Sequence, residues 1–264
     1  MKNVRTFLGA NIRGTIVCGD ALDFLKGLKK DSASLVFLDP PFNLGKPYSS
    51  EKRNLDRRPE RDYQAWIENV LIEASRIIKP GGSLYLYHIP KWALRFGFFL
   101  DGRLEFRHWI AISMKNGFAR GMRLYPAHYA LLWFTKGDPA NFKRPKIAPK
   151  KCRHCDKYVK DYGGYRSIIE EKGINLSDFW EDLSPVRHAD KKHRKLNELP
   201  SVLFNRVMEM SGSPNELYVD PFGGSGSGVV AAAGAGMKFA CCDLVLTNCN
   251  IVARRLNALV GSED

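Results

Sequence analysis

The stretch that decides the fold is Leu217-Tyr-Val219, Asp220-Pro-Phe-Gly-Gly-Ser-Gly-Ser-Gly228 and Val229 to Ala235. It predicts a strand, a glycine-rich turn and a helix in direct succession. Such a turn needs glycine, because its backbone requires positive φ angles and a close approach to a ligand. A further strand, Lys238 to Cys242, ends at Asp243, where a carboxylate can accept hydrogen bonds from a ribose diol. The stretch therefore favours a nucleoside-cofactor site, with an ordinary tight turn as the alternative.

The glycine turn also narrows the choice of cofactor. A dinucleotide fingerprint has the spacing Gly-x-Gly-x-x-Gly, whereas here Gly223-Gly-Ser-Gly226 follows Asp-Pro-Phe. A pyrophosphate also requires backbone donors at a helix N-terminus. S-adenosylmethionine has no phosphate and carries a positive sulfonium, so the acid at the start of the loop, Asp220, suits it better. S-adenosylmethionine is therefore the expected cofactor.

Strands and helices alternate on both sides of this loop. A helix from Arg61 to Ile78 is expected to stop at Pro80-Gly81-Gly82, and Leu199-Pro200 is expected to open another, with proline at its first position. Further strands are expected at Thr15 to Cys18, Ser34 to Leu38, Leu84 to Tyr87, Phe106 to Ser113 and Ala130 to Thr135, and a last helix at Asn248 to Leu259. The pattern predicts an α/β fold with a Rossmann-like, doubly wound, mostly parallel sheet, in a single domain over residues 1–264.

A second loop, Asp39-Pro40-Pro41-Phe42, directly follows the strand that ends at Leu38. Open α/β sheets place their active sites at this end of their strands, and two prolines stiffen the turn. The Asp39 carboxylate and the Pro40 carbonyl are both acceptors, so their natural partner is an NH₂ group, which has two donors. Phe42 offers a flat face on which a flipped base can stack. The alternative is a proline-rich turn in which Asp39 caps local backbone amides.

The charge of the chain points to a polyanionic partner. The formal net charge is +13, and the excess is concentrated between Lys143 and Lys160 and between Arg187 and Lys195. Contacts to phosphates would use such a surplus, although solvated charge runs are the simpler alternative. No apolar run is long enough to span a bilayer or to form a signal peptide, so the expected location is the cytosol, without membrane contact and with reduced cysteines.

A cysteine pair, Cys152-Arg-His-Cys155, has the Cys-x₂-Cys spacing of a zinc knuckle. A closed tetrahedral site needs two more ligands, and His188 and His193 would complete a Cys₂His₂ set. Structural zinc is thus a hypothesis for this pair. The alternative is two reduced cysteines in a loop.

Taken together, the motifs resemble those of the DNA amino-methyltransferases, in the β group whose catalytic motif precedes the cofactor motif. Beside the two loops, the resemblance rests on Gly19-Asp20-Ala-Leu, Ile78-Lys-Pro-Gly-Gly-Ser-Leu84, Trp133-Phe-Thr-Lys-Gly-Asp138 and Asn197-Glu-Leu-Pro200. It implies a class I methyltransferase fold in circularly permuted motif order. The residues that it assigns to the S-adenosylmethionine site are Asp20, Ala21, Asp39, Asn197, Glu198, Leu199, Asp220, Phe222, Gly223, Gly224, Ser225, Gly226, Asp243 and Leu244.

The resemblance also implies a reaction. A base flips out of the DNA and stacks on Phe42, and its amine, held by Asp39 and Pro40, attacks the methyl group of the cofactor. A motif that begins with Asp favours adenine N6 as the acceptor, with cytosine N4 as the alternative. An RNA methyltransferase and a non-catalytic DNA-binding protein are less favoured, since the catalytic and cofactor residues are present and no RNA-binding module is recognisable.

An irregular, basic insertion at about residues 136–190 is the expected target-recognition segment for double-stranded DNA. The basic side chains expected at the DNA are Lys143, Arg144, Lys150, Lys151, Arg153, Arg166, Arg187, Lys191 and Lys192. The resemblance further implies a restriction–modification or phage modification system in a bacterial or phage-infected cell. A cognate restriction endonuclease is then a candidate partner, and the protein is expected as a monomer or a homodimer.

Overall fold

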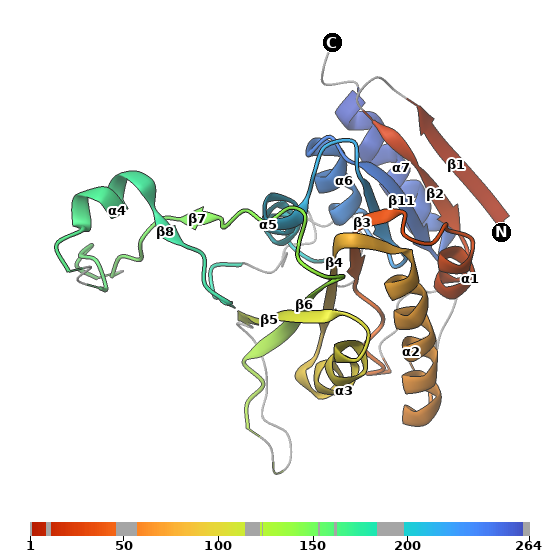
Figure 1. Cartoon of the computed structure of the whole chain (residues 1–264), viewed down its shortest axis with the longest axis horizontal. Coiled ribbons are helices and arrows are strands. Elements are labelled where there is room, and N and C mark those ends of the chain that lie inside the picture. The colour runs from red at the N-terminus through yellow and green to blue at the C-terminus, as the bar shows by residue number, and fades with distance from the viewer. Residues whose placement is uncertain are drawn as a thin grey trace.

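One large sheet forms the centre of the protein. The computed structural model describes residues 2–8, 12–45, 57–113, 122, 124–152, 154–160, 163–183 and 198–260. In these ranges nine strands pair in the order β1-β2-β11-β10-β3-β4-β6-β5-β9 (Figure 1). The strands are β1 (Lys2–Leu8), β2 (Arg13–Cys18), β3 (Ala33–Leu38), β4 (Ile78–His88), β5 (Glu105–Ser113), β6 (His128–Thr135), β9 (Phe179–Trp180), β10 (Leu217–Asp220) and β11 (Lys238–Asp243).

The middle of this sheet is parallel. Strands β2, β11, β10, β3 and β4 run in one direction, whereas β1 and β6 pair antiparallel to their neighbours at either side. Val219 of β10 lies beside Val36 of β3, although 183 residues separate them in sequence. The last two strands of the chain are thus inserted between the second and the third. The predicted mostly parallel α/β sheet is confirmed.

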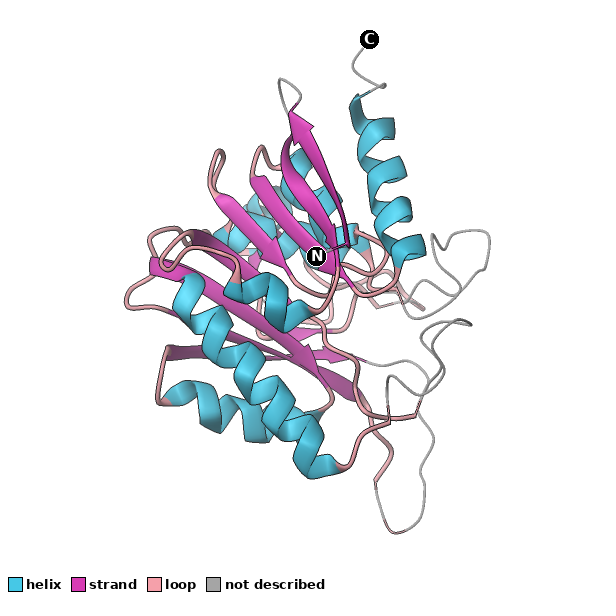
Figure 2. Cartoon of the chain, turned by 90° about the vertical axis from the view of Figure 1, so that its right-hand side faces the viewer, coloured by secondary structure: helices cyan, strands magenta, loops and turns pink. Residues whose placement is uncertain are grey.

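Helices cover both faces of the sheet (Figure 2). On one face, apolar residues of α1 (Ala21–Lys26), α2 (Glu60–Ile77) and α3 (Pro90–Asp101) form a core with Val36 and Leu38. On the other, α5 (Ser201–Ser211), α6 (Ser227–Gly234) and α7 (Leu246–Val260) pack with Leu35 and Phe37. Strand β3 is apolar throughout because both of its faces are buried, which is typical of parallel sheets.

The elements that were not predicted are β1, α1 and α3 in the body of the protein, and β7, α4, β8 and β9 in the insertion that was expected to be irregular. The expected helix from Arg61 to Ile78 is confirmed as α2, although Pro80-Gly81-Gly82, which were expected to stop it, lie within β4. Ile78 is already extended, and the pairing of β3 with β4 jumps from Ala33–Ile78 to Leu35–Ser83, so the Pro-Gly-Gly segment forms a bulge. The placement of Pro200 is also wrong by one position: it caps α5 and Ser201 is the first helical residue.

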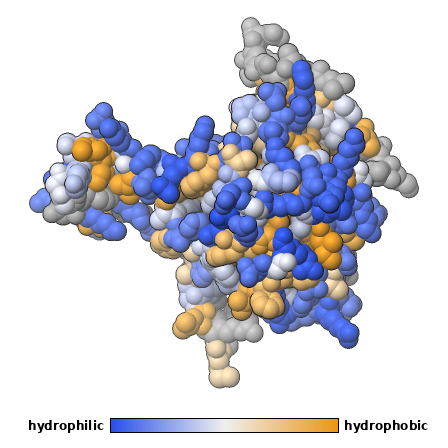
Figure 3. Space-filling view, in the orientation of Figure 1, coloured by the Kyte–Doolittle hydropathy of each residue, from blue (hydrophilic) through white to orange (hydrophobic). Residues whose placement is uncertain are grey.

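A segment beyond β6 projects from the body of the protein (Figure 1). It contains β7 (Lys146–Ile147), paired antiparallel with β8 (Ile174–Asn175), and α4 (Arg166–Lys172), which buries none of its residues. Its surface mixes hydrophilic and apolar areas (Figure 3). The chain returns to the body at β9, which adds to β5 at the sheet edge. Among the described residues, no helix combines the length and the apolar character that crossing a membrane would require.

Candidate active site

The two motif loops meet at one edge of the sheet. Asp39 follows β3 and Asp220 ends β10, and these two strands are parallel neighbours. Burial raises the pKa of Asp220 to about 7, and the negative charges of Asp39 and Asp243 add to this rise. The Asp-Pro-Pro-Phe loop and the glycine loop therefore lie at the same edge of the sheet, with their carboxylates within electrostatic range of one another.

Asp220 lies beneath the glycine loop and supports it. Its side chain is 3% exposed, and its Oδ1 accepts a hydrogen bond from the backbone N–H of Phe222 (3.0 Å). Its Oδ2 accepts one from the hydroxyl of Tyr218 (3.2 Å). Because both oxygens accept hydrogen bonds inside the protein, this acid orients the loop.

Asp243 joins the glycine loop to the start of α7. Its Oδ2 accepts the backbone N–H of Gly224 (2.9 Å), and its Oδ1 accepts the N–H of Val245 (2.8 Å) and the side-chain amide of Asn248 (3.1 Å). The carboxylate is therefore fixed in orientation at the end of β11. This is the position that the sequence predicted for a group that binds a ribose diol.

The packing of the protein itself requires glycine at positions of this loop. A Cβ atom on Gly223 would overlap the Sγ of Cys241, and one on Gly226 would come within 2.9 Å of Val252. Gly226 also has a φ of 81°, which side chains rarely adopt. The loop thus lies directly against β11 and α7.

A contact that the sequence did not reveal holds the far end of the loop. Nη1 of Arg255, in α7, donates to the carbonyl of Ser225 (2.7 Å) and contacts the hydroxyl of Ser227 (3.1 Å). The same nitrogen lies 3.8 Å from the carboxylate of Glu198, whose side chain is 4% exposed. Glu198 and the loop, both assigned to the cofactor from sequence, are therefore linked through Arg255. Leu199 is partly buried beside them, and Asn197 lies outside the described residues.

The remaining predicted cofactor residues lie at the ends of β2, β10 and β11. Asp20 caps α1, because its Oδ1 accepts the N–H groups of Leu22 (2.8 Å) and Asp23 (3.2 Å). Ala21 is the first, buried residue of that helix, whereas Leu244 is 39% exposed. The ring of Phe222 stands edge-on to Trp66 at 6.0 Å. Carboxylates for a cation and a diol, beside aromatic rings, fit S-adenosylmethionine chemically.

In the catalytic loop, Asp39 is partly exposed, whereas Pro40 is buried and Phe42 is only 6% exposed. The ring of Phe42 is stacked on His88 at 4.7 Å and packs against Tyr87 (5.9 Å) and Tyr129 (5.8 Å). The sequence predicted an open face on Phe42. In this conformation, one face is already covered by the imidazole, and the phenylalanine contributes to the wall of the site.

Tyr87 and Tyr129 complete this wall and were missed from sequence. Burial raises the pKa of both phenols, and the negative charge of Asp39 raises them further. Both phenols therefore lie within electrostatic range of the Asp39 carboxylate. The only sequence signal for Tyr129 was its place beside His128 at the start of a strand.

The zinc hypothesis is untested by this structure. Cys152 and Cys155 lie in one turn, and N–H groups of His154 and Cys155, followed by the Cys155 thiol, lower the pKa of Cys152 through hydrogen bonds. Both thiols are free, and no group of three metal-ligating side chains is found within the described part of the chain. His188 and His193, the other expected ligands, lie outside that part.

Five of the expected DNA contacts are described, and all are exposed. They are Lys143, Arg144, Lys150, Lys151 and Arg166. Lys150 pairs with Glu181, Lys151 lies 3.3 Å from Asp156, and Arg166 lies 3.6 Å from Glu170. Exposed pairs of this kind are weak, so phosphates can compete for these cations. Arg153, Arg187, Lys191 and Lys192 lie outside the described residues.

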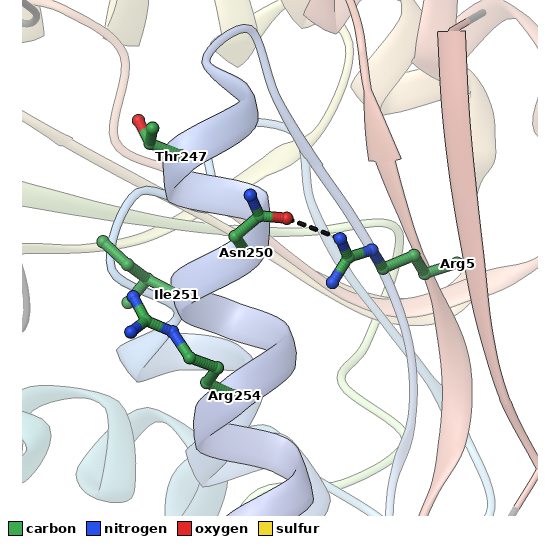
Figure 4. Close-up of a pocket in the computed structure, with 5 residues that line it drawn as sticks. All are labelled: Arg5, Thr247, Asn250, Ile251 and Arg254. Carbon is green, nitrogen blue, oxygen red and sulfur yellow. Dashed lines mark hydrogen bonds between the residues drawn. The ribbon is translucent and has the colours of Figure 1, made fainter.

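A surface pocket lies between β1 and α7 (Figure 4). Arg5 reaches across it and donates to the side-chain oxygen of Asn250 over 2.6 Å. The pocket is lined by Arg5, Thr247, Asn250, Ile251 and Arg254. It contains none of the residues assigned to the catalytic or cofactor loops.

The fold and the site define the class of protein. It is an α/β protein whose glycine-rich loop fits a nucleoside cofactor, and beside that loop lies a proline-rich loop that begins with an acid. The chain belongs to the DNA methylase family, whose model matches residues 33–254. It is 40% identical to the Type II methyltransferase M.BamHI of Bacillus amyloliquefaciens over 92% of this chain and 57% of that protein. It is 30% identical to the Type II methyltransferase M.HpaI of Haemophilus parainfluenzae, over 80% of this chain and 64% of the relative. The chain therefore spans less than two thirds of the length of these relatives.

Solved structures with the same fold include two methyltransferases. The PvuII DNA methyltransferase (cytosine-N4-specific) superposes with a TM-score of 0.66 at 17% identity, over 92% of this chain and 86% of that one. The M1.HpyAVI–SAM complex gives 0.61 at 17% identity, over 92% and 98%. At this identity the likeness establishes the fold, which agrees with the class I fold expected from the motifs.

Proposed function

We propose that the chain is an S-adenosylmethionine-dependent DNA methyltransferase that acts on an exocyclic amine of a base. The observation that carries this proposal is the meeting of Asp39 with the Asp220–Gly226 loop on neighbouring parallel strands, in a member of the DNA methylase family. A methyl acceptor held at Asp39 would then lie next to a cofactor held at the glycine loop.

The chemistry follows from the acceptors of the catalytic loop. The Asp39 carboxylate and the Pro40 carbonyl accept the two N–H bonds of the amine, which directs its lone pair away from them. S-adenosylmethionine supplies a methyl group on a positive sulfonium, which is already an activated leaving group. The N–C bond forms as the S–C bond breaks, and the surplus proton on nitrogen then leaves to Asp39 or to water. Positioning supplies much of the rate, so Asp39 need not be a strong base.

Adenine N6 is the proposed acceptor and cytosine N4 is the second candidate. The acid that begins the Asp39-Pro40-Pro41-Phe42 motif supports adenine, and so does a relative named DNA adenine methyltransferase YhdJ, of Escherichia coli, at 24% identity over 85% of this chain and 76% of that protein. The cytosine-N4-specific PvuII enzyme shares the fold and supports the alternative. Both bases present a similar NH₂ group to the same two acceptors.

The projecting segment is the proposed target-recognition element within one methyltransferase domain. It carries exposed cations on a part of the chain that packs little against the body, as α4 buries no residue. Lys and Arg side chains there would contact DNA phosphates and fix the register of the duplex. Because several relatives are named Type II methyltransferases, a cognate restriction endonuclease is the proposed partner in function.

Labelled methyl transfer to mixed-sequence DNA, followed by mass spectrometry of the nucleosides, tests the proposal. The expected product is N6-methyladenine; N4-methylcytosine would replace the adenine assignment and keep the class. Methyl transfer to RNA and not to DNA would overturn both the adenine and the cytosine assignments. Asp39→Ala is expected to abolish transfer and to retain cofactor binding, and Asp39→Asn serves as the matched control that keeps the shape of the side chain.

A further inference from the structure

A series of three hydrogen bonds runs from the catalytic loop into the interior of the protein. The hydroxyl of Tyr63, in α2, donates to the carbonyl of Pro41 over 2.6 Å. The same hydroxyl lies 2.7 Å from Nε2 of His88, at the end of β4. Nδ1 of that imidazole accepts the backbone N–H of Ile89 over 2.8 Å. Tyr63 is 1% exposed and His88 is 0% exposed, so water does not compete for these bonds.

The geometry allows one assignment of the protons. Nδ1 of His88 accepts an N–H, so in the neutral ring the proton is on Nε2. Tyr63 has one hydroxyl proton, which it gives to the Pro41 carbonyl, and its oxygen accepts the proton of Nε2. The bond at Nδ1 of His88 and the bond at the Pro41 carbonyl therefore require the same placement of the protons. Burial lowers the pKa of His88 to about 3, which keeps the ring neutral.

The catalytic loop needs such an outside donor. Pro40 and Pro41 have no N–H group, so the turn cannot be held by its own amides at these two positions. Its carbonyls must be fixed from elsewhere, and Tyr63 fixes the second of them. The His88 ring also stacks on Phe42 at 4.7 Å, at an interplanar angle of 29°. One pair of side chains therefore holds the last two residues of the motif, Pro41 and Phe42.

We infer that Tyr63 and His88 form a hydrogen-bond relay that positions the catalytic loop for methyl transfer. The relay sets the direction of the Pro41 carbonyl and the plane of Phe42, and through them the orientation of the Pro40 carbonyl and Asp39. Neither Tyr63 nor His88 touches the substrate in this scheme, so both are positioning residues. The inference rests on the proposed function, because the role given to Tyr63 and His88 is a role in methyl transfer.

Tyr63→Phe removes the hydroxyl and keeps the ring. The expected result is a fall of about 10- to 100-fold in the single-turnover rate of methyl transfer, since small displacements of reacting groups are costly. Affinities for S-adenosylmethionine and DNA are expected to stay within about threefold, because the loop still folds. Tyr85→Phe is the matched control: its buried hydroxyl bonds Ser211 (2.7 Å), away from the loop, so its rate should not change.

Two replacements of His88 separate the relay from packing. His88→Gln places an amide N–H where Nε2 donates, whereas His88→Asn reaches only the position of Nδ1. Both lose the stacked ring. The relay predicts that His88→Gln keeps most of the parent protein's rate of methyl transfer and that His88→Asn does not. Equal rates in these two variants, or an unchanged rate for Tyr63→Phe, would overturn the inference.

A spectroscopic readout keeps this test distinct from the proposed function. Nitrogen NMR of the imidazole is expected to show the Nε2–H form of His88 unchanged from about pH 5 to 8. The Nδ1–H form would disprove the relay whatever the protein methylates. Absence of methyl transfer by the parent protein, with the expected tautomer present, would instead refute the proposed function and leave the hydrogen-bond assignment standing.

Discussion

Arg255 and Ser225 are joined by a 2.7 Å hydrogen bond that connects the last helix to the backbone of the glycine loop. The same guanidinium contacts the hydroxyl of Ser227 and lies 3.8 Å from the carboxylate of Glu198, so it links these groups to the loop. The loop's shape therefore depends on a residue 30 positions later in the chain.

Arg255→Met is expected to weaken S-adenosylmethionine binding about tenfold, because hydrogen bonds to charged groups contribute on the order of 1.5–3 kcal/mol. The loss would come from a loosened loop and from the removal of the positive charge beside Glu198. Arg254→Met, which changes an exposed arginine on the same helix, is the matched control. Calorimetric titration of both variants measures the effect; equal affinities would contradict it.

Asp220 predicts a pH dependence. Its pKa in the folded protein, about 7, lies above the ordinary value of 3.8, so the stability that its proton contributes is fully present below that ordinary value. The contribution is lost as the pH rises through 7. The cofactor-free protein should therefore lose thermal stability between about pH 4 and 7 from this group, and Asp220→Asn should flatten that part of the profile.

The same carboxyl predicts proton release on cofactor binding. A positive ligand favours the ionised form of Asp220, so the affinity should rise with pH up to about 7. Calorimetry in two buffers of different ionisation enthalpy detects the released proton. Identical heats in the two buffers at about pH 6 would refute this coupling.

Gly223→Ala is expected to lower the free energy of unfolding by about 1–3 kcal/mol, the usual cost of overpacking. The new Cβ would overlap the thiol of Cys241. Adding Cys241→Ala should restore part of the loss, since the Cys241 Cβ lies 3.9 Å from the new atom. Gly234→Ala, whose Cβ would meet nothing within 4 Å, is the control and should be neutral or stabilising. Denaturant unfolding of the parent protein, the two single glycine variants and the double variant measures these free energies.

Zinc at the Cys152 and Cys155 turn remains a prediction from spacing. Elemental analysis of the purified parent protein is expected to find one zinc ion per chain, and Cys152→Ser should remove it. A parent protein purified without chelators that contains no zinc would end the hypothesis. His193→Ala then tests whether that histidine completes the site.

The sequence predicted the parallel part of the sheet and the position of both loops directly after strands, because these features depend on local patterns. Apolar β3 and β10 each run directly into an acidic turn, and parallel strands bring such turns to one edge. Helix α1 was missed because its six residues are too few for a periodic signal, although Asp20 provided a capping residue. Helix α3 was missed although Pro90 stands at its start and Trp92, Phe96 and Leu100 recur at helical spacing.

The supports of the site could not be predicted from one sequence. Tyr63, His88 and Pro41 lie on a helix, a strand and a loop, and only the packed fold brings their polar atoms within hydrogen-bond distance. Arg255 belongs to no sequence motif, and its contact with Ser225 arises only in the folded protein. The burial of Phe42 likewise depends on His88, Tyr87 and Tyr129 arriving from two other strands.

The strand order has a consequence for synthesis on the ribosome. Strands β10 and β11 fill the gap between β2 and β3, so a nascent chain that has emerged only as far as Trp180 lacks the middle of its sheet. Strands β2 and β3 then each have an unpaired inner edge, flanked by apolar surface that awaits α5, α6 and α7. The sheet therefore cannot close in the order of synthesis, and its closure waits until β10 and β11 have emerged.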